Sequence, residues 1–249
     1  MHTVVLVHGG SHGAWCWYKL TPKLEQAGLR VITPDSAGLG DDETPASEVT
    51  LERWADDICR ILDEQDQPVI LVGHSRGGII ISTAAEKRPA KVAKLVYVSA
   101  MMIGSGETAF GVVHEDGTSL MLPNAEMASD GASMSIRAEA LKDVFYGYAS
   151  DEDLALAKGR LRPDPVAPLM TPLVLTDEAF GSVPRAYVEC LQDNAVPIGL
   201  QRRMQEVFPC GEVVSIATDH TPFFSEPDRL AQCLIDMARV DSGPIGRSD

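Results

Sequence analysis

The sequence has 249 residues, 45% of them hydrophobic, which is enough to bury one sizeable core. Its formal net charge of −15 argues against nucleic acid or an anionic membrane surface as a partner, because both attract positive charge. No run of about 18 uncharged apolar residues and no leader-like N-terminus is visible, so we expect a cytoplasmic chain that does not span a membrane.

The first hundred residues alternate short apolar runs with amphipathic ones. The apolar runs predict strands at 3–8, 29–35, 68–74 and 91–100. The amphipathic runs between them predict helices at 14–28, 50–65 and 76–89. The alternation returns near the end and predicts strands at 185–193 and 211–217 and helices at 198–209 and 226–240. Continuously apolar strands separated by helices are typical of a parallel sheet with helices on both faces.

Residues 101–180 break this alternation. They contain scattered Gly, Met and Pro, with helical patterns near 134–147 and 151–161 and no strong strand. We therefore expect an α/β core, residues 1–100 and 181–249, of about six mostly parallel strands flanked by helices. The intervening 101–180 are predicted to form a helical cap over the carboxyl edge of the sheet, and the last nine residues a loose tail.

The apolar run “ILVGHSRGGIII” is interrupted by the motif Gly73-His74-Ser75-Arg76-Gly77, between a predicted strand and a predicted helix. Gly-x-Ser-x-Gly at such a junction is typical of a turn that presents a nucleophilic serine. The strained turn makes the Ser75 hydroxyl project from the sheet edge, and the glycines leave room for close backbone approach. The alternative is a chance match, which the position after the third predicted strand disfavours.

A nucleophilic serine needs a base, and the base needs an orienting acid. In a fold of this kind the acid and then the histidine follow the serine along the chain. His220 is the histidine that lies late, in the loop after the last predicted strand. For the acid we favour Asp193, at the end of the penultimate strand. Asp35 ends an early strand, Asp177 lies in the insertion, and Asp219 is the immediate neighbour of the histidine in the chain.

The glycine-rich segment “HGGSHG”, residues 8–13, follows the first predicted strand. Its backbone N–H groups are accessible, so we predict that the Gly10 and Arg76 N–H groups form an oxyanion hole. A tight turn is the alternative for the glycine-rich segment. The Arg76 side chain opposes the dipole of the helix that begins there. We expect it to point away and to pair with a carboxylate.

Five segments resemble the branch of the α/β-hydrolase superfamily that contains plant methylesterases, hydroxynitrile lyases and bacterial pyrethroid-type carboxylesterases. They are “LVHGGSHGAWCWYKLTPKLE”, “VILVGHSRGG”, “SDEDLALAKGRLRP”, “FGSVPRAYVECLQD” and “TDHTPFFSEPDRL”. The resemblance spans nearly the whole chain and is weakest over 101–150. It implies an α/β-hydrolase fold with a helical cap, and Ser75, Asp193 and His220 as a catalytic triad.

The same branch contains lyases, which carry Thr after the first histidine, Glu before the serine and Lys after the catalytic histidine. Here those positions are Gly9, His74 and Thr221, which match the esterase pattern. Cyanide release benefits from a buried cation near the leaving anion, and Thr221 offers none. Gly9 is expected to leave room for water and an alkoxide leaving group. The resemblance therefore favours an esterase.

Together these features predict a serine carboxylic-ester hydrolase that acts on small to medium apolar or aromatic esters, methyl esters included, through an acyl-enzyme on Ser75. The five cysteines lack metal-ligand spacing, so we expect no metal and no cofactor, and either a monomer or a homodimer. A hydroxynitrile lyase, an acyl transferase and a small-molecule receptor without turnover stay open as alternatives. The predicted substrate pocket contains Gly9, His74, Met101, Met102, Phe110, Leu122, Phe180 and Thr221.

Overall fold

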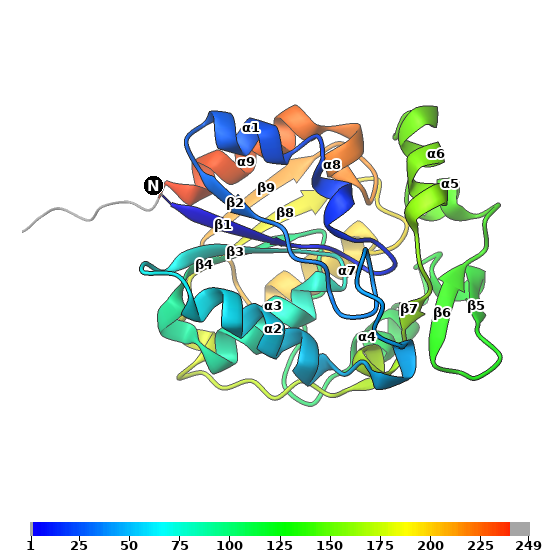
Figure 1. Cartoon of the computed structure of the whole chain (residues 1–249), viewed down its shortest axis with the longest axis horizontal. Coiled ribbons are helices and arrows are strands. Elements are labelled where there is room, and N and C mark those ends of the chain that lie inside the picture. The colour runs from blue at the N-terminus through cyan, green and yellow to red at the C-terminus, as the bar shows by residue number, and fades with distance from the viewer. Residues whose placement is uncertain (1, 240–249) are drawn as a thin grey trace, which may run out of the picture.

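A six-stranded sheet, parallel throughout, forms the centre of the computed structural model, which describes residues 2–239 (Figure 1). Its strands are β1 (Thr3–Val7), β2 (Arg30–Ile32), β3 (Val69–His74), β4 (Val92–Val98), β8 (Arg185–Cys190) and β9 (Glu212–Ile216). Their order in the sheet is β2-β1-β3-β4-β8-β9. The chain reverses its winding between β1 and β3, and ligands of open α/β sheets bind beyond the carboxyl ends of the strands at such a point.

Successive side chains of a strand point to opposite faces of the sheet, and here both sets are apolar. Helices therefore cover both faces. Val5 and Val7 face one cluster, which also contains side chains from α2 (Leu51–Asp63), α3 (Gly77–Lys87) and α7 (Ile198–Val207). Val4 and Leu6 face the other cluster, with α1 (Thr21–Gln26), α8 (Pro222–Ser225) and α9 (Pro227–Ala238). Short 3-10 turns lie at Ala14–Trp17, Ala46–Glu48, Pro89–Lys91, Leu122–Asn124, Ala167–Met170 and Phe180–Ser182.

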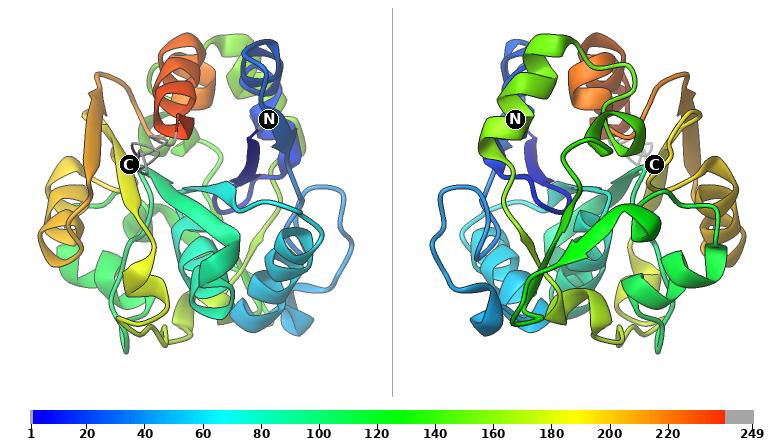
Figure 2. Two further views of the ribbon diagram at one scale, coloured as in Figure 1. Left: turned by 90° about the vertical axis from the view of Figure 1, so that its left-hand side faces the viewer. Right: turned by 90° about the vertical axis from the view of Figure 1, so that its right-hand side faces the viewer.

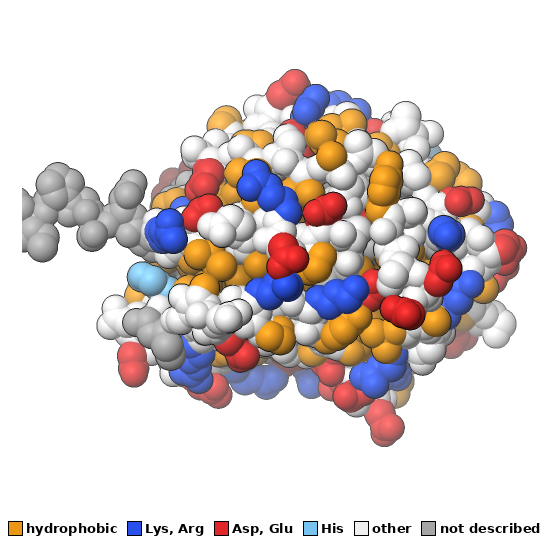
Figure 3. Space-filling model, turned by 90° about the horizontal axis from the view of Figure 1, so that it is seen from above, with side chains coloured by type: hydrophobic (Ala, Val, Ile, Leu, Met, Phe, Trp, Pro, Cys, Tyr) orange, Lys and Arg blue, Asp and Glu red, His pale blue; other side chains and the backbone are white. Residues whose placement is uncertain are grey.

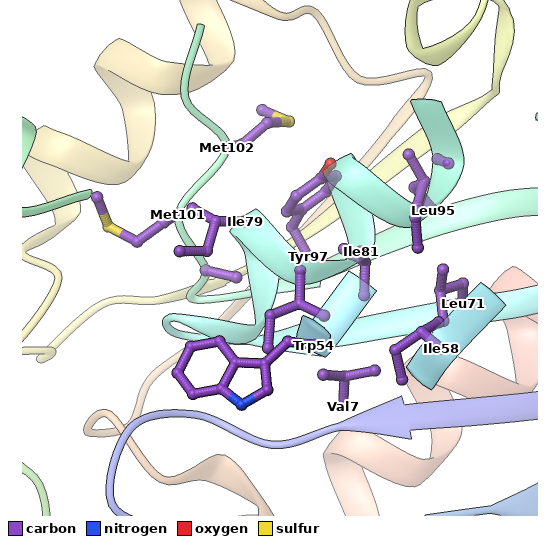
Figure 4. Packing of buried hydrophobic residues seen from close by; sticks show 14 of the residues in the cluster. Val7, Trp54, Ile58, Leu71, Ile79, Ile81, Leu95, Tyr97, Met101 and Met102 are labelled. Carbon is purple, nitrogen blue, oxygen red and sulfur yellow. The ribbon is translucent and has the colours of Figure 1, made fainter. Parts of the chain in front are cut away.

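The core on the α2–α3 face fixes the strands that carry the site (Figure 4). Trp54 of α2 is buried in the same cluster as Val7 and Leu71, and its indole N–H donates to the Ala37 carbonyl at 2.9 Å. Ile79 of α3 packs in the same cluster. Each such apolar side chain contributes about 1.5–3 kcal/mol by leaving water, so the ends of β1 and β3 are held rigidly.

The helix predicted at 14–28 is two shorter pieces, a 3-10 turn at Ala14–Trp17 and α1. Pro22 lies in the first turn of α1. Proline lacks the N–H that an uninterrupted helix would need there, so the helix starts anew at this point. The predicted end of that helix is correct, because Gly28 adopts a φ of +85° just after it.

The segment 101–180 between β4 and β8 is not purely helical. It contains α4 (Ala109–Asp116), β5 (Ala125–Met127), β6 (Ser133–Ile136), α5 (Leu141–Val144), α6 (Asp151–Arg160) and β7 (Asp164–Pro165). Strands β5, β6 and β7 form an antiparallel sheet. The helix predicted near 134–147 is therefore wrong over β6, where Met134 and Ile136 alternate with serines at the strand period of two. The helix predicted near 151–161 is present as α6.

Figure 1 shows α5, α6 and β5–β7 standing together at one end of the central sheet, and the right-hand view of Figure 2 shows this green segment in front of the core. On the face seen in Figure 3, acidic and basic side chains are interspersed, so the net charge of −15 is not gathered in one patch there. Within residues 2–239, no helix combines the length and the apolar character that crossing a membrane requires. The predicted tail, 241–249, lies outside the described residues.

Candidate active site

Ser75 sits in a strained turn between β3 and α3. Its φ of +52° lies in the left-handed region that side chains other than glycine rarely adopt. Two backbone bonds hold the turn: Ser75 N–H donates to the Val98 carbonyl at 3.3 Å, and Met101 N–H donates to the Ser75 carbonyl at 2.9 Å. Gly77 is required for sterics, because a Cβ there would come within 2.7 Å of the Val7 carbonyl oxygen. The turn thus aims the serine hydroxyl out of the sheet edge.

The structure brings Ser75, His220 and Asp193 into one hydrogen-bonded row. His220 Nε2 lies 2.9 Å from Ser75 Oγ, and His220 Nδ1 lies 2.6 Å from Asp193 Oδ2. Asp193 Oδ1 accepts the N–H groups of Ala195 at 2.7 Å and Val196 at 2.9 Å. Because the carboxylate accepts from Nδ1–H, Nε2 is free to accept the serine proton.

Two of the three rival carboxylates, Asp219 and Asp35, accept hydrogen bonds from other groups. Asp219 accepts the N–H groups of Tyr148 and Thr221 and the hydroxyl of Ser225. Asp35 accepts the Ala14 N–H at 2.6 Å, beside the loop that follows β1.

One further hydrogen-bond donor to Asp193 was not predicted from the sequence. Ser99 directly follows β4 and adopts a φ of +40°. Its hydroxyl donates to Asp193 Oδ2, while its N–H donates to the Val188 carbonyl at 2.9 Å. A serine at a strand end carries no distinctive pattern, so the sequence gives no signal for this contact.

His74 hydrogen-bonds to the backbone of the loop that carries His220. Its Nε2 lies 2.7 Å from the His220 carbonyl oxygen, and the two rings are 4.6 Å apart. Since a carbonyl can only accept, His74 Nε2 carries the proton. Burial holds the pKa of His74 well below its usual 6.5, so the ring is neutral.

Two backbone N–H groups at the cavity beside Ser75 have no hydrogen-bond acceptor within residues 2–239. Gly10 lies in the loop after β1, and Arg76 precedes α3. Both residues line the cavity at Ser75, and neither N–H donates to an acceptor within residues 2–239. β1 and β3 are neighbours in the sheet, paired at Val7 and Gly73, which explains why the loops that follow them meet. The arrangement can bind an oxyanion that forms beside Ser75.

The Arg76 side chain pairs with a carboxylate, as expected. Its Nε lies 3.3 Å from Asp164 Oδ1, and its Nη2 donates to the Gly9 carbonyl at 3.0 Å. The guanidinium stacks over the Trp54 ring, 4.0 Å from its centroid. Burial raises the pKa of the Asp164 carboxyl, and the neighbouring guanidinium opposes that shift.

Two adjoining cavities meet at Ser75, and residues of the insertion line both. Four residues predicted for the pocket do line them: His74, Met101, Phe110 and Leu122. The remaining lining residues do not belong to that predicted set of eight. They are Ser11, His12, Ala109, Val113, Met121, Met134, Ser135, Ile136, Phe145, Asp164, Leu169 and Val196. Apolar side chains dominate, so the cavities suit an apolar acyl or alcohol group.

The other four predicted pocket residues lie outside these cavities. A Cβ on Gly9 would lie 2.7 Å from His74 Nδ1, so the expected free space is filled by the neighbouring ring. Met102 lines a different cavity, together with Leu200 and Phe208, and its N–H lies 3.3 Å from the Met204 sulfur. Phe180 packs on the Phe208 ring at 5.6 Å. Thr221 is fully buried and donates to the Phe145 carbonyl at 3.0 Å.

Within residues 2–239, no group of three or more His, Cys, Asp or Glu side chains could hold a metal ion. All five cysteines are free thiols, so none of them is tied to another by a disulfide.

Comparison with known protein sequences finds relatives that are named as methylesterases. Methylesterase 1 of Arabidopsis thaliana is 34% identical over 250 residues, which cover 94% of this chain and 95% of that protein. A longer protein of the same plant, named “Putative methylesterase 11, chloroplastic”, is 35% identical over 95% of this chain. This chain spans 64% of the length of that longer relative.

Solved structures agree with the sequence relatives. Polyneuridine aldehyde esterase superposes with a TM-score of 0.85 at 29% identity, covering 95% of this chain and 99% of its own. A pyrethroid hydrolase from Sphingobium faniae JZ-2 gives a TM-score of 0.84 at 30% identity, covering 96% and 98%. These matches confirm the fold and the resemblance predicted from the sequence. Since the model of the alpha/beta hydrolase family also matches residues 4–233, the chain belongs to that family.

Proposed function

We propose that this chain is a serine carboxylic-ester hydrolase for small to medium apolar or aromatic esters, methyl esters included. The observation that carries the proposal is the row Ser75–His220–Asp193, which ends at a mostly apolar cavity. The relatives named methylesterase, esterase and pyrethroid hydrolase support the same reaction class. No step of this reaction needs a metal or an organic cofactor.

The reaction begins when Ser75 Oγ attacks the ester carbonyl carbon and His220 Nε2 takes the hydroxyl proton. Asp193 keeps His220 in the tautomer that accepts this proton and stabilises the imidazolium that results. The Gly10 and Arg76 N–H groups bind the oxyanion of the tetrahedral intermediate. His220 then gives the proton to the departing alkoxide, which leaves as the alcohol.

The second half of the reaction releases the acid. Water replaces the alcohol, and His220 removes one of its protons as the oxygen attacks the acyl-Ser75 carbonyl. Collapse of the second tetrahedral intermediate breaks the bond to Ser75 Oγ, and the proton returns from His220 to the serine.

The segment 101–180 acts as a cap on a core of residues 1–100 and 181–249. Support comes from the insertion residues that line the cavity at Ser75, among them Met134 and Leu169. The net charge of −15 favours a small-molecule ester over nucleic acid or a membrane surface as the partner. A cytoplasmic location and a monomeric or homodimeric state stay predictions from the sequence.

The test compares wild type with Ser75→Ala on p-nitrophenyl acetate and butyrate, with mandelonitrile cleavage followed on the same preparations. We expect sustained ester turnover in wild type, its loss in Ser75→Ala and no cyanide release. The matched control is Ser182→Ala, because the Ser182 hydroxyl is exposed and bonds only within its own turn. Cyanide release without ester turnover would replace the esterase by a lyase, and one bound product per chain without turnover would indicate a receptor.

The acyl transferase alternative predicts a different product balance. If added alcohol diverts most of the acyl group from water at millimolar concentrations, the chain is a transferase. If the free acid stays the main product, hydrolysis is the reaction.

A further inference from the structure

A buried ion pair joins the serine turn to the insertion. Arg76 Nε lies 3.3 Å from Asp164 Oδ1, and the two side chains are only 5% and 8% exposed. Asp164 belongs to β7 of the insertion, and Arg76 directly follows the nucleophile. Both residues line the cavity that contains Ser75. The reaction scheme above uses the backbone N–H of Arg76 but assigns no role to either side chain.

Each member of the pair also holds one end of the three-residue segment that carries the Gly10 N–H. Arg76 Nη2 donates to the Gly9 carbonyl at 3.0 Å, and the Ser11 N–H donates to Asp164 Oδ1 at 3.1 Å. Gly10 itself packs against the carboxylate, because a Cβ there would lie 2.9 Å from Asp164 Oδ2. The segment is therefore held on both sides of its central residue.

The insertion makes further contacts to the same loop. Arg162 N–H donates to the Ser11 carbonyl at 3.0 Å. His12 Nδ1 lies 2.7 Å from the Gly10 carbonyl, and His12 Nε2 lies 2.7 Å from the Tyr146 hydroxyl. Since the carbonyl can only accept, Nδ1 donates to it, and Tyr146 donates to Nε2. The peptide that follows Gly10 is thus fixed from the insertion side as well.

We propose that the Arg76–Asp164 pair positions the oxyanion hole, with Asp164 of the insertion as a positioning residue for the hydrolysis. Arg76 supplies one N–H donor from its backbone, and its side chain sets the distance to the loop that carries the other donor. β7 is then part of the catalytic apparatus as well as of the cap. The inference rests on the proposed ester hydrolysis.

A structural role alone would give a different result when both charges are removed together. A buried ion pair contributes little net stability compared with apolar side chains of similar volume, whereas removing one partner strands the other charge. The double variant Arg76→Leu/Asp164→Leu therefore separates folding from catalysis. Its backbone N–H groups are still present, but the two side-chain contacts that tie the serine turn to the Gly10 loop are gone, and the Arg162 and His12 contacts still hold that loop.

For this double variant we expect a melting temperature near that of wild type, KM within about threefold, and kcat lower by about 10–100-fold. Complete loss of one oxyanion donor typically costs about 10²–10³ in kcat, and misplacement costs part of that. Affinity for an alkyl trifluoromethyl ketone, whose adduct with Ser75 carries an oxyanion, should fall by the same factor as kcat/KM. Unchanged kcat and unchanged ketone affinity in a folded double variant would overturn the proposal.

Asp164→Asn provides a second test that keeps the size of the side chain. Its amide oxygen can still accept from Ser11, but the charge that holds Arg76 is gone. Positioning predicts a lower kcat. If the carboxylate acted only by repelling the oxyanion, removing its charge would raise kcat, and that result would refute positioning even if the double variant failed to fold.

The matched control is Lys19→Leu/Asp153→Leu. Lys19 Nζ and Asp153 Oδ2 lie 2.6 Å apart and join the core to α6 of the insertion, with Asp153 only 1% exposed. This pair does not contact residues 9–11. We expect kcat to stay within about twofold of wild type. An equal loss of kcat in both double variants would show that kcat depends on any ion pair between the core and the insertion, and would overturn the specific role of Arg76–Asp164.

Labelling with a fluorophosphonate distinguishes failure of this inference from failure of the proposed function. Wild type that is not labelled at Ser75 would remove the hydrolase proposal, and the inference with it. Wild type that is labelled rapidly, together with a double variant labelled at the same rate, would remove only the inference. A labelling rate that falls by the same factor as kcat supports both.

Discussion

Acid should destabilise this protein at a pH above that at which most of its carboxylates titrate, because three neutral histidines are buried around the site. Burial lowers the pKa of His8 to about 3 and that of His12 to about 4, and it holds the pKa of His74 well below 6.5. Two of the rings also use a nitrogen as an acceptor: His8 Nε2 accepts from Ser36 N–H at 3.0 Å, and His12 Nε2 accepts from Tyr146. Protonation would remove both acceptors.

The direction follows from proton binding in the two states. Histidine in an unfolded chain has a pKa of about 6.5, so between pH 6.5 and about 4 the unfolded state binds more protons than the native state. The free energy of unfolding therefore rises with pH in this window and falls as the pH drops through it. At pH 5.5 each unfolded ring carries about 0.9 proton, and the native His8 and His12 rings carry almost none.

The expected loss of unfolding free energy is a large fraction of the total stability of an ordinary domain. His8 and His12 together should take up about two protons on unfolding at pH 5.5, which corresponds to about 2.5 kcal/mol of unfolding free energy per pH unit, and His74 adds to this in the same direction. Between pH 7 and pH 5 His8 and His12 each cost about 2 kcal/mol, about 4 kcal/mol together, and His74 adds to that loss. Domains of this kind are stable by about 5–15 kcal/mol in total, so much of the margin disappears by pH 5.

The assay is urea unfolding followed by tryptophan fluorescence at pH 7, 6 and 5, with proton uptake measured at pH 5.5. Carboxylates such as Asp153 and Glu189 have lowered pKa values, so they contribute stability that is lost only below about pH 4.5 and lie outside this window. The raised pKa of Asp164 acts in the opposite direction, because the native carboxyl binds a proton more readily than the unfolded one, and it offsets part of the histidine effect. His114→Gln is the matched control, because His114 is exposed on α4. An unfolding free energy that is flat between pH 7 and pH 5, or uptake below about one proton, would refute the reasoning.

Three further predictions concern the serine turn, the acid and the cavity. Ser99→Ala removes the hydroxyl that donates to Asp193, and kcat should fall about tenfold, as expected for a hydrogen bond to a charged group; steady-state kinetics with an unchanged melting temperature would check this. Gly77→Ala should lower the unfolding free energy by about 1–3 kcal/mol, because its Cβ meets a backbone carbonyl of β1, whereas Gly159→Ala in α6 meets open space and should raise it by up to about 1 kcal/mol; urea titrations compare the two. Phe110→Ala enlarges the cavity, and the ratio of kcat/KM for p-nitrophenyl hexanoate over acetate should rise about tenfold; an unchanged ratio would place the acyl chain elsewhere.

The parts of the site that follow strand ends could be predicted from the sequence. The glycines that interrupt an apolar run predict the serine turn at Ser75. A parallel sheet also brings the carboxyl ends of its strands to one edge. The segments that carry Asp193 and His220 also follow strands, so chain order was enough to place them near the serine. Their meeting distances of 2.6 and 2.9 Å then depend on side-chain packing that no pattern encodes.

The lining of the cavity was predicted less well, because adjacent residues at a strand end can face opposite ways. Met101 lines the cavity, whereas its neighbour Met102 packs against Met204. Both are buried apolar residues of the same type, so composition cannot separate them. The hairpin that contains Met134 failed for a related reason: two apolar residues spaced by one serine fit a strand, but so short a pattern does not exclude a helix.

Gly9 shows why absence of a side chain does not mean empty space. The sequence suggested room for water and a leaving group, but His74 Nδ1 and Ser75 Cβ occupy the volume that a Gly9 side chain would need. Glycine is required at this position because the loop must approach the serine turn, and the same approach lets Arg76 reach the Gly9 carbonyl. A larger residue at position 9 would push the loop away from the turn and separate the two N–H donors. The same close approach therefore explains both the misjudged space and the geometry on which an oxyanion hole depends.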